Sequence, residues 1–321
     1  MYTIRSIEWA AFMYLRSLSF NQSIAIMEAL YQDGVISKDC LIEHIEQLAD
    51  RIPNNKAITQ WLKPTRSGYF AVDGTWMKYR GKDIVLLVIF DVKTLDIVTY
   101  RTALEEDSKS YSALIKDAYD ELKPCAKGFF CDGELSLLKV LRKEFSSVPV
   151  QVCVFHKEIR AKQIIPFVRP RTKIDKLLKE RIQRILFAPT KQEALDGLAE
   201  LKAFAKQHQG EEKVKKIVGI IKRNFHLLLT HFDHPEMSPY NNVLEGFNHM
   251  IKRRIKRMKG FKKPINISRW LKLLMLDWRF HQLKETRFKE RRNKTPLHLA
   301  GVQLPKKIYN WLYYVRKNYH K

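Results

Sequence analysis

Residues 69–103 read YFAVDGTWMKYRGKDIVLLVIFDVKTLDIVTYRTA, and this stretch decides the fold. Its middle, residues 84–92, is almost wholly apolar, which is typical of a strand that is buried on both faces of a sheet. Short polar turns at residues 80–82 and 93–96 separate it from apolar segments at 69–78 and 97–103. Turns this short join neighbouring antiparallel strands, so the sequence predicts three meandering strands.

The segments after residue 103 alternate between the helical and the strand pattern. Residues 108–122 predict a helix, 128–131 a short apolar strand, 135–145 a second helix, and 148–155 a fifth strand rich in β-branched residues. The expected order is therefore β-β-β-α-β-α-β. This order predicts an α/β fold built on a five-stranded mixed sheet with helices packed against it.

The flanking segments read as helical. Residues 1–66 predict four short helices joined by tight turns, which suits a small helix-turn-helix-like domain as well as a plain helical cap. Residues 157–236 predict an all-helical insertion, and 237–321 predict further helices broken at Pro264 and Pro296. The expected domains are an N-terminal helical domain at 1–66, the first part of the core at 67–156, the insertion at 157–236, and the rest of the core with a basic helical C-terminus at 237–321.

The charge of the chain is large and uneven. The formal net charge is +25, and residues 246–321 alone carry 22 Lys and Arg against three Asp and Glu. A field of this sign attracts a polyanion, of which nucleic acid is the commonest. A solubilising surface is the plain alternative, although such surfaces usually mix both signs. Anionic lipid is a weaker rival because no apolar run approaches the roughly 20 residues that span a bilayer.

Cysteine usage and the first residues bear on the compartment. The four cysteines are scattered without a disulfide-like rhythm, and no C-x-x-C pair indicates a zinc ribbon. The first 17 residues contain Glu8 and no continuous apolar segment, which is a poor signal peptide. We therefore expect a reduced, cytoplasmic setting with no membrane partner.

Two aspartates stand out by their context. Asp73 interrupts the apolar strand FAVDGTW, where Asp is disfavoured and a buried charge needs a partner. Asp132 ends the apolar strand FFCDG, and an acid at the carboxyl end of a strand faces the crevice where open α/β sheets bind ligands. A turn or a helix cap is the plain alternative for each aspartate.

Glu245 stands out because it is the only acidic residue on the polar face of a predicted helix. Ser238 and Pro239 predict the start of that helix. One face of the projected helix is apolar, and the other is formed by Asn241, Asn242, Glu245, Asn248, His249, Lys252 and Lys256. A solvated face is the plain alternative. A single carboxylate among amide and basic groups fits a metal ligand beside a DNA backbone better.

Three carboxylates are what metal-assisted phosphoryl chemistry needs. Two Mg²⁺ ions about 3.5–4 Å apart can clamp an in-line displacement at phosphorus. Mg²⁺ prefers carboxylate oxygens and keeps several waters, so three acids can hold it. Asp73, Asp132 and Glu245 are therefore the candidate catalytic residues and the candidate metal ligands, for two Mg²⁺ or Mn²⁺ ions.

The local motifs resemble those of the mutator-type family of DDE transposases, which includes many bacterial insertion sequences. The matching segments are residues 70–76 (FAVDGTW), 129–133 (FFCDG), 153–156 (CVFH) and 241–248 (NNVLEGFN), followed by the basic segment around Lys252 and Arg253. Each motif is weak alone, but four of them occur in the expected order over residues 67–262. An N-terminal zinc ribbon, common among related sequences, is missing, so recognition of terminal repeats by residues 1–66 is in doubt.

The resemblance implies an RNase H-like catalytic domain, interrupted by a helical insertion, with Asp73, Asp132 and Glu245 as metal ligands. It implies that His156, and with it Cys153 and Asn248, lie near the active site. The expected DNA-contacting residues are Asn241, Asn242, His249, Lys252, Arg253 and Lys256. A zinc site of Cys153, His156, His231 and His234 is possible by residue type alone.

The expected activity is metal-dependent cleavage and strand transfer on double-stranded DNA, at transposon terminal inverted repeats and in target DNA. Joining two transposon ends implies at least a homodimer, in a prokaryotic, nucleoid-associated setting. An RNase H-like nuclease or integrase would use the same acids, so it is an open alternative. A domesticated DNA-binding descendant is a weaker one, because such copies tend to lose a catalytic acid.

Overall fold

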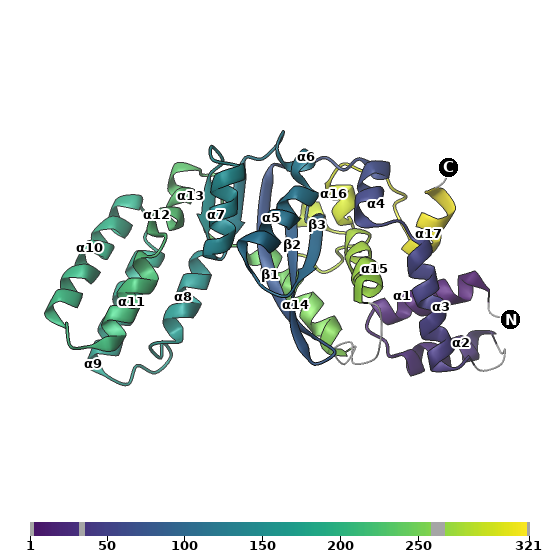
Figure 1. Cartoon of the computed structure of the whole chain (residues 1–321), viewed down its shortest axis with the longest axis horizontal. Coiled ribbons are helices and arrows are strands. Elements are labelled where there is room, and N and C mark those ends of the chain that lie inside the picture. Colours follow the sequence, from purple (N-terminus) through teal and green to yellow (C-terminus); the bar gives the residue numbers. More distant parts are fainter. Residues whose placement is uncertain (1–2, 32–35, 258–266, 320–321) are drawn as a thin grey trace. The chain divides into compact units, whose positions relative to one another are not determined.

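The computed structural model describes residues 3–31, 36–257 and 267–319 (Figure 1). Five strands form one sheet in the order β3-β2-β1-β4-β5. Their bounds are Tyr69–Tyr79 for β1, Lys82–Asp91 for β2, Ile97–Ala103 for β3, Gly128–Cys131 for β4 and Val150–Val152 for β5. β2 and β3 are antiparallel, whereas β4 is parallel to both β1 and β5. The predicted α/β class and five-stranded mixed sheet are therefore confirmed.

The chain forms two compact units, and β1 contributes to both. The first unit consists of residues 1–67, 74–125 and 243–321, and the second of residues 68–73 and 126–242. Each unit thus gathers segments that are distant in the sequence. The N-terminal helices share a unit with the C-terminal helices, while the helices between β5 and residue 242 share a unit with β4 and β5.

In the first unit, the N-terminal helices are α1 (Ile4–Leu15), α2 (Phe20–Tyr31), α3 (Lys38–Arg51) and α4 (Asn55–Leu62). The side chains of Thr3, Ser37 and Asn54 cap α1, α3 and α4 by accepting backbone N–H groups, as such N-cap residues do. α15 (Ile267–Arg279) packs on α1, α3 and α4, and α17 (Trp311–Asn318) packs on α1. Helices α1, α3 and α4 therefore share a hydrophobic core with α15, and α17 adds to it through α1.

The rest of the first unit surrounds β2 and β3. β2 is buried over its last eight residues, as expected for a central strand. The single helix predicted over 108–122 is divided into α5 (Ser108–Asp117) and α6 (Tyr119–Leu122), because Ala118 leaves helical geometry at φ −123°, ψ 11°. The remaining elements are α14 (Asn242–Arg257, in this unit from Val243 onward), the 3₁₀ turn η2 (Lys289–Arg291) and α16 (Pro296–Leu299).

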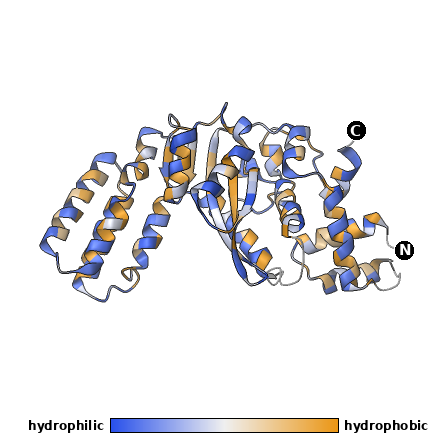
Figure 2. Cartoon of the chain, viewed as in Figure 1, coloured by the Kyte–Doolittle hydropathy of each residue, from blue (hydrophilic) through white to orange (hydrophobic). Residues whose placement is uncertain are grey.

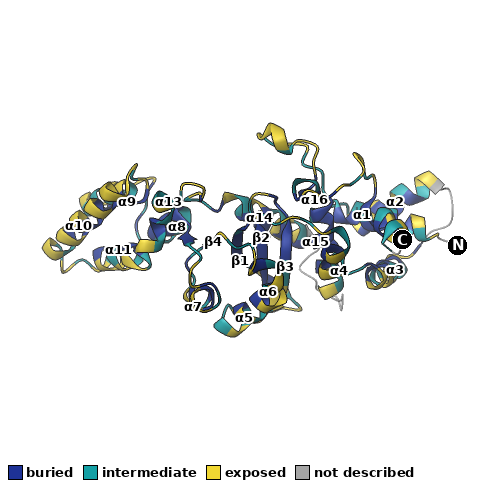
Figure 3. Ribbon diagram, turned by 90° about the horizontal axis from the view of Figure 1, so that it is seen from above, coloured by how far each residue is buried: buried dark blue, intermediate teal, exposed yellow. Residues whose placement is uncertain are grey.

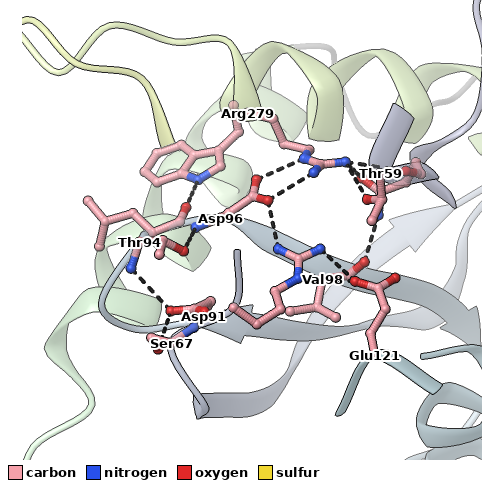
Figure 4. Close-up of polar contacts among 12 residues, drawn as sticks. Thr59, Ser67, Asp91, Thr94, Asp96, Val98, Glu121 and Arg279 are labelled. Carbon is pink, nitrogen blue, oxygen red and sulfur yellow. Dashed lines mark hydrogen bonds and ion pairs between the residues drawn. The ribbon is translucent and has the colours of Figure 1, made fainter. Parts of the chain in front are cut away.

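A buried ion cluster ties these elements together (Figure 4). Asp96, at the start of β3, accepts hydrogen bonds from both Arg279 of α15 and Arg66, each at 2.8 Å. Arg279 also donates to Asn55 and Thr59 of α4, and Arg66 donates to Glu121 of α6. Asp96 and Arg279 are both fully buried. Since each charge has partners, the cluster can stay ionised without water and hold α4, α15 and the start of β3 in register.

The second unit combines strand ends with a helical array. α7 (Leu135–Glu144) connects β4 to β5, and α8 (Val154–Lys162) follows β5 directly. The array continues with α9 (Lys173–Leu186), α10 (Lys191–Gln207), α11 (Glu212–Lys222), α12 (Phe225–Leu228) and α13 (Thr230–Asp233). α9 contacts α8, α10 and α11. These helices confirm the predicted helical character of residues 157–236. Their hydrophobic residues face inward and their polar residues outward (Figures 2 and 3).

The fifth strand is shorter than predicted. It ends at Val152, and α8 begins at Val154, within the stretch expected to stay extended through residue 155. The strand prediction relied on apolar and β-branched composition, which also suits the first turn of a helix packed on a core. The N–H of Val154 donates to the carbonyl of Pro239 at 3.1 Å, so a tertiary contact replaces further pairing in the sheet.

Among the helices of residues 3–31, 36–257 and 267–319, none is both long and apolar enough to cross a membrane.

Candidate active site

Asp73 lies within β1, just past its parallel pairing with β4, and Asp132 directly follows β4. β1 and β4 are parallel, with Tyr69 opposite Gly128 and Ala71 opposite Phe130. Continuing this register by two residues sets Asp73 opposite Asp132. Residues in register on parallel strands point to the same face, about 4.8 Å apart. Both side chains are half-buried, whereas Phe70 to Val72 before Asp73 are fully buried.

The pKa of Cys131 also indicates that Asp73 and Asp132 lie near each other. Burial raises the pKa of the Cys131 thiol above its usual range, and the carboxylates of Asp132 and Asp73 raise it further. Both negative charges therefore act on the same buried thiol. Two carboxylates this close repel each other unless a cation is shared between them. A divalent ion is the cation that such a pair of oxygen donors can hold.

Local contacts orient Asp132. One carboxylate oxygen accepts the N–H of Glu134 at 3.0 Å, and the other accepts from Arg160 of α8 at 3.1 Å. Gly133, which lies between Asp132 and Glu134 in the sequence, has φ +89°. A Cβ at this position would lie 3.1 Å from the side chain of Val152. A glycine is required at this turn, because other residues rarely adopt that φ. The backbone can thus turn directly after β4, which keeps the Asp132 carboxylate at the end of that strand.

Arg160 and Glu106 were missed by sequence reasoning. Arg160 follows Asp132 by 28 residues, and no local pattern links the two. Glu106 lies against Gly74, the residue after Asp73, so closely that a Cβ at Gly74 would be 2.0 Å from its Oε1. The glycine of the D-G pair in β1 therefore makes room for a carboxylate. In the sequence, the only sign of close contacts around the two aspartates is the glycine that follows each of them, Gly74 and Gly133.

Cys153 and His156 lie on one side of α8. Cys153 is the N-cap, and three residues later His156 lies in the first turn, so the two side chains are neighbours rather than on opposite faces of a strand. The Cys153 sulfur and a ring nitrogen of His156 are within 4.8 Å. The N–H of Cys153 donates to the carbonyl of Cys131 at 2.8 Å, next to Asp132. Cys153 is buried, at 2 % exposure.

The zinc site that was possible by residue type does not form among the described residues. His231 and His234 do not join Cys153 and His156 in any group of ligand atoms at metal-binding distance in that part of the chain. The N–H of His231 and its ring nitrogen are instead directed at the side chain of Gln151, and the ring also contacts the carbonyl of Leu228. His231 therefore serves the packing of β5.

Glu245 lies in the first turn of α14, within the first unit. The buried face of α14 includes Phe247, whose ring packs against those of Phe90 and Trp278 at 5.3 and 5.1 Å. This packing fixes the rotation of the helix about its axis. Glu245 is half-buried beside that face. Asp73 and Asp132 belong to the second unit, so the convergence of all three acids stays a prediction.

Most of the predicted DNA-contacting residues share an exposed face of α14. Those residues are Asn242, His249, Lys252, Arg253 and Lys256. Asn241 is different: α14 begins at Asn242 rather than Pro239, and Asn241 precedes it with only 3 % exposure. Its expected place on the polar helix face is wrong, because Ser238 caps a local turn at Tyr240 instead of starting the helix. Asn248 is also buried, at 8 % exposure.

The chain is an α/β protein in which the register of two parallel strands continues to Asp73 and Asp132, and its first unit carries a basic helix face. The model of the family described as "Transposase, Mutator family" matches residues 7–283. The chain therefore belongs to the Mutator family of transposases, which supports a transposase function and implies DNA binding. No curated protein matches the chain.

Proposed function

We propose that this protein is a DNA transposase that cuts DNA at transposon ends and joins those ends to target DNA, with Asp73, Asp132 and Glu245 holding divalent metal ions. The observation that carries the proposal is the parallel register of β1 and β4, whose continuation sets Asp73 of β1 beside Asp132, the residue after β4. Carboxylate oxygens are the ligands that Mg²⁺ prefers, and Mn²⁺ accepts them too. When bound, two such ions stabilise the attacking and leaving oxygens of the phosphoryl transfer.

The chain's own residues divide the remaining work. Asp73 and Asp132 supply oxygen donors from a sheet whose order supports an RNase H-like assignment. Arg160 holds the Asp132 carboxylate by a 3.1 Å ion pair and offsets part of the local negative charge. Glu245 supplies the third carboxylate from a helix whose rotation is fixed by the packing of Phe247. Each carboxylate is thus carried on, or directly after, a helix or strand of its own unit, which favours a preorganised donor.

The exposed face of α14 would position the DNA. Lys252 and Lys256 lie two and three helical turns after Glu245, and Arg253 is adjacent to them. Contacts of such residues with phosphates fix the register of DNA without reading its bases. Synapsis of two transposon ends would require at least a homodimer, which brings two copies of this face together.

The test is a cleavage and strand-transfer assay on duplexes that carry the inverted repeats flanking the gene. We expect nicking at the repeat end and joining to a second duplex in Mg²⁺ or Mn²⁺, and neither in chelator. Hydrolysis without joining would instead identify the nuclease alternative, and binding without either step would identify the domesticated one. Chelator-resistant cleavage would overturn the metal mechanism.

A further inference from the structure

A second basic site lies in the second unit, between α8 and α11. It is a pocket of about 280 Å³. Its lining residues include four cations and no acid: Lys157, Arg160, Lys216 and Arg223. Arg160 is paired with Asp132, and Lys216 lies 3.6 Å from Glu212, but neither acid lines the pocket. The pocket wall itself therefore presents four cationic side chains and no anionic one, which favours a bound anion.

Lys157 is the most firmly held of the four cations, because it is buried and hydrogen-bonded to the backbone. Its side chain is buried, at 1 % exposure, and its ammonium donates to the carbonyls of Ile220 and Arg223 at 3.0 and 2.6 Å. These carbonyls belong to the C-terminal end of α11, where cations are favoured. Two of three N–H donors are thereby used, and the residue still lines the pocket. Burial, followed by the charges of Arg160 and Arg223, lowers the pKa of Lys157 to about 8.

Gly219 is an unexplained glycine in the same wall. It lies inside α11, where glycine destabilises a helix relative to alanine. A Cβ at this position would meet no atom within 4 Å, so packing does not require a glycine. Gly197 in α10 is the contrasting case, because a Cβ there would lie 2.9 Å from Ile185. At Gly219 the missing side chain leaves backbone open toward the pocket, as is common where a ligand approaches closely.

Arg160 connects the pocket to the candidate active site. Its guanidinium lies 3.1 Å from the carboxylate of Asp132, and the residue also lines the pocket. A ligand in the pocket is therefore one side chain away from the acid that would face the scissile phosphate. DNA presents one phosphate for every 3.4 Å of rise along each strand, so a strand cleaved at Asp132 carries further phosphates past this wall.

We infer that the pocket between α8 and α11 binds a backbone phosphate of the DNA strand that enters the candidate active site. The guanidinium groups of Arg160 and Arg223 match the geometry of phosphate oxygens, and Lys157 and Lys216 add charge. The site would recognise any sequence, because it touches no base. This inference rests on the proposed function only in taking DNA to be the polyanion at Asp132.

The test uses the full chain and a fluorescein-labelled duplex of arbitrary sequence, with anisotropy measured in chelator over a range of salt concentrations. Gly219→Leu should fill the pocket mouth and weaken binding about tenfold, and reduce the slope of log affinity against log salt by about one unit. Its melting temperature should equal or exceed that of the wild type, because leucine favours the helix. A loss of binding could then not be ascribed to unfolding.

A charge-matched pair of variants provides the control. Lys216→Gln with Arg223→Gln removes two cations that line the pocket and should reproduce the loss. Lys215→Gln with Lys222→Gln removes two exposed cations of the same helix that do not line it, and should change affinity less than twofold. Equal losses for both pairs, or unchanged binding by Gly219→Leu, would overturn the pocket.

The two proposals fail in different ways. If the wild type shows no metal-dependent cleavage but Gly219→Leu still loses binding, the transposase mechanism fails and the phosphate pocket stands. If the wild type cleaves normally and Gly219→Leu binds DNA with the wild-type salt slope, the pocket fails and the mechanism stands.

Discussion

The carboxylate of Asp96 and the carboxylates of Asp73 and Asp132 sit in contrasting surroundings. Asp96 is fully buried and pairs with two guanidinium groups at 2.8 Å. Burial opposes its charge, yet Arg279 and Arg66 hold its pKa below the usual range. Asp73 and Asp132 are half-buried, and Asp132 forms an ion pair with Arg160 at 3.1 Å. The first carboxylate is sealed inside the protein, whereas the other two remain partly open to solvent, where a ligand can reach them.

This difference separates a structural charge from a functional one. A buried acid with complete partners contributes to the register of the elements that it joins, and its loss leaves cations unpaired. Two partly exposed acids on neighbouring strands can in addition offer oxygen donors to a metal ion. Substitution should therefore affect stability at Asp96 and chemistry at Asp73 and Asp132.

The largest effect is expected for Asp73→Asn and Asp132→Asn. Each variant keeps the shape of the side chain but loses the charge that holds a metal ion. We expect cleavage to fall about a thousandfold or more, which corresponds to about 4 kcal/mol in the barrier. DNA binding in chelator and the fold should persist, because both side chains are only half-buried and the basic face of α14 is unchanged. Measurable Mg²⁺-dependent cleavage by either variant at wild-type rates would rule the pair out as ligands.

A smaller but substantial effect on folding is expected for Asp96→Asn. The substitution leaves the guanidinium groups of Arg279 and Arg66 without their shared anion, which should cost about 3–5 kcal/mol in the free energy of unfolding. Urea denaturation measures this cost. Asp83→Asn is the matched control, since Asp83 forms an exposed ion pair with Lys78 and should change stability by less than about 1 kcal/mol. Similar midpoints for both variants would contradict the distinction.

Metal binding should stabilise only the protein that has both active-site acids. At ten times the dissociation constant, Mg²⁺ should raise the free energy of unfolding by about 1.4 kcal/mol. Differential scanning calorimetry with and without Mg²⁺ measures this increment. Asp96→Asn should keep it although the variant is less stable, and Asp132→Asn should lose it. An increment that survives in Asp132→Asn would assign the ion to another site.

The smallest effect concerns a third setting, that of the half-buried His281 beside Arg16. Partial burial, followed by the charge of Arg16, lowers the pKa of His281 to about 4. Between pH 6.5 and 4 the unfolded chain binds a proton that the folded chain does not, so this group makes stability fall as the pH falls through that window. His281→Gln should flatten this part of the profile and leave stability near pH 8 almost unchanged. The prediction would be contradicted if the urea midpoints of the wild type and of His281→Gln changed by the same amount from pH 8 to pH 4.

Several features of this protein were determined by local sequence. The apolar run of β2 cannot be exposed, so its place as a central strand follows from hydrophobicity and from the short turns at either side. Asp73 and Asp132 were recognisable because each interrupts or ends an apolar strand, where a charge needs a reason. The exposed face of α14 followed from helical periodicity.

Only the tertiary structure decided the rest, because contacts between distant residues leave no local pattern. The end of β5 depends on a hydrogen bond from Val154 to Pro239, which is 85 residues away. The partnership of Arg160 with Asp132, and the pocket that Arg160 shares with α11, depend on how helices pack rather than on periodicity. The same holds for Asn241, which the start of α14 leaves buried and outside the polar face. Local sequence determines which residues favour a strand, a helix or a charge, and packing determines which of them meet.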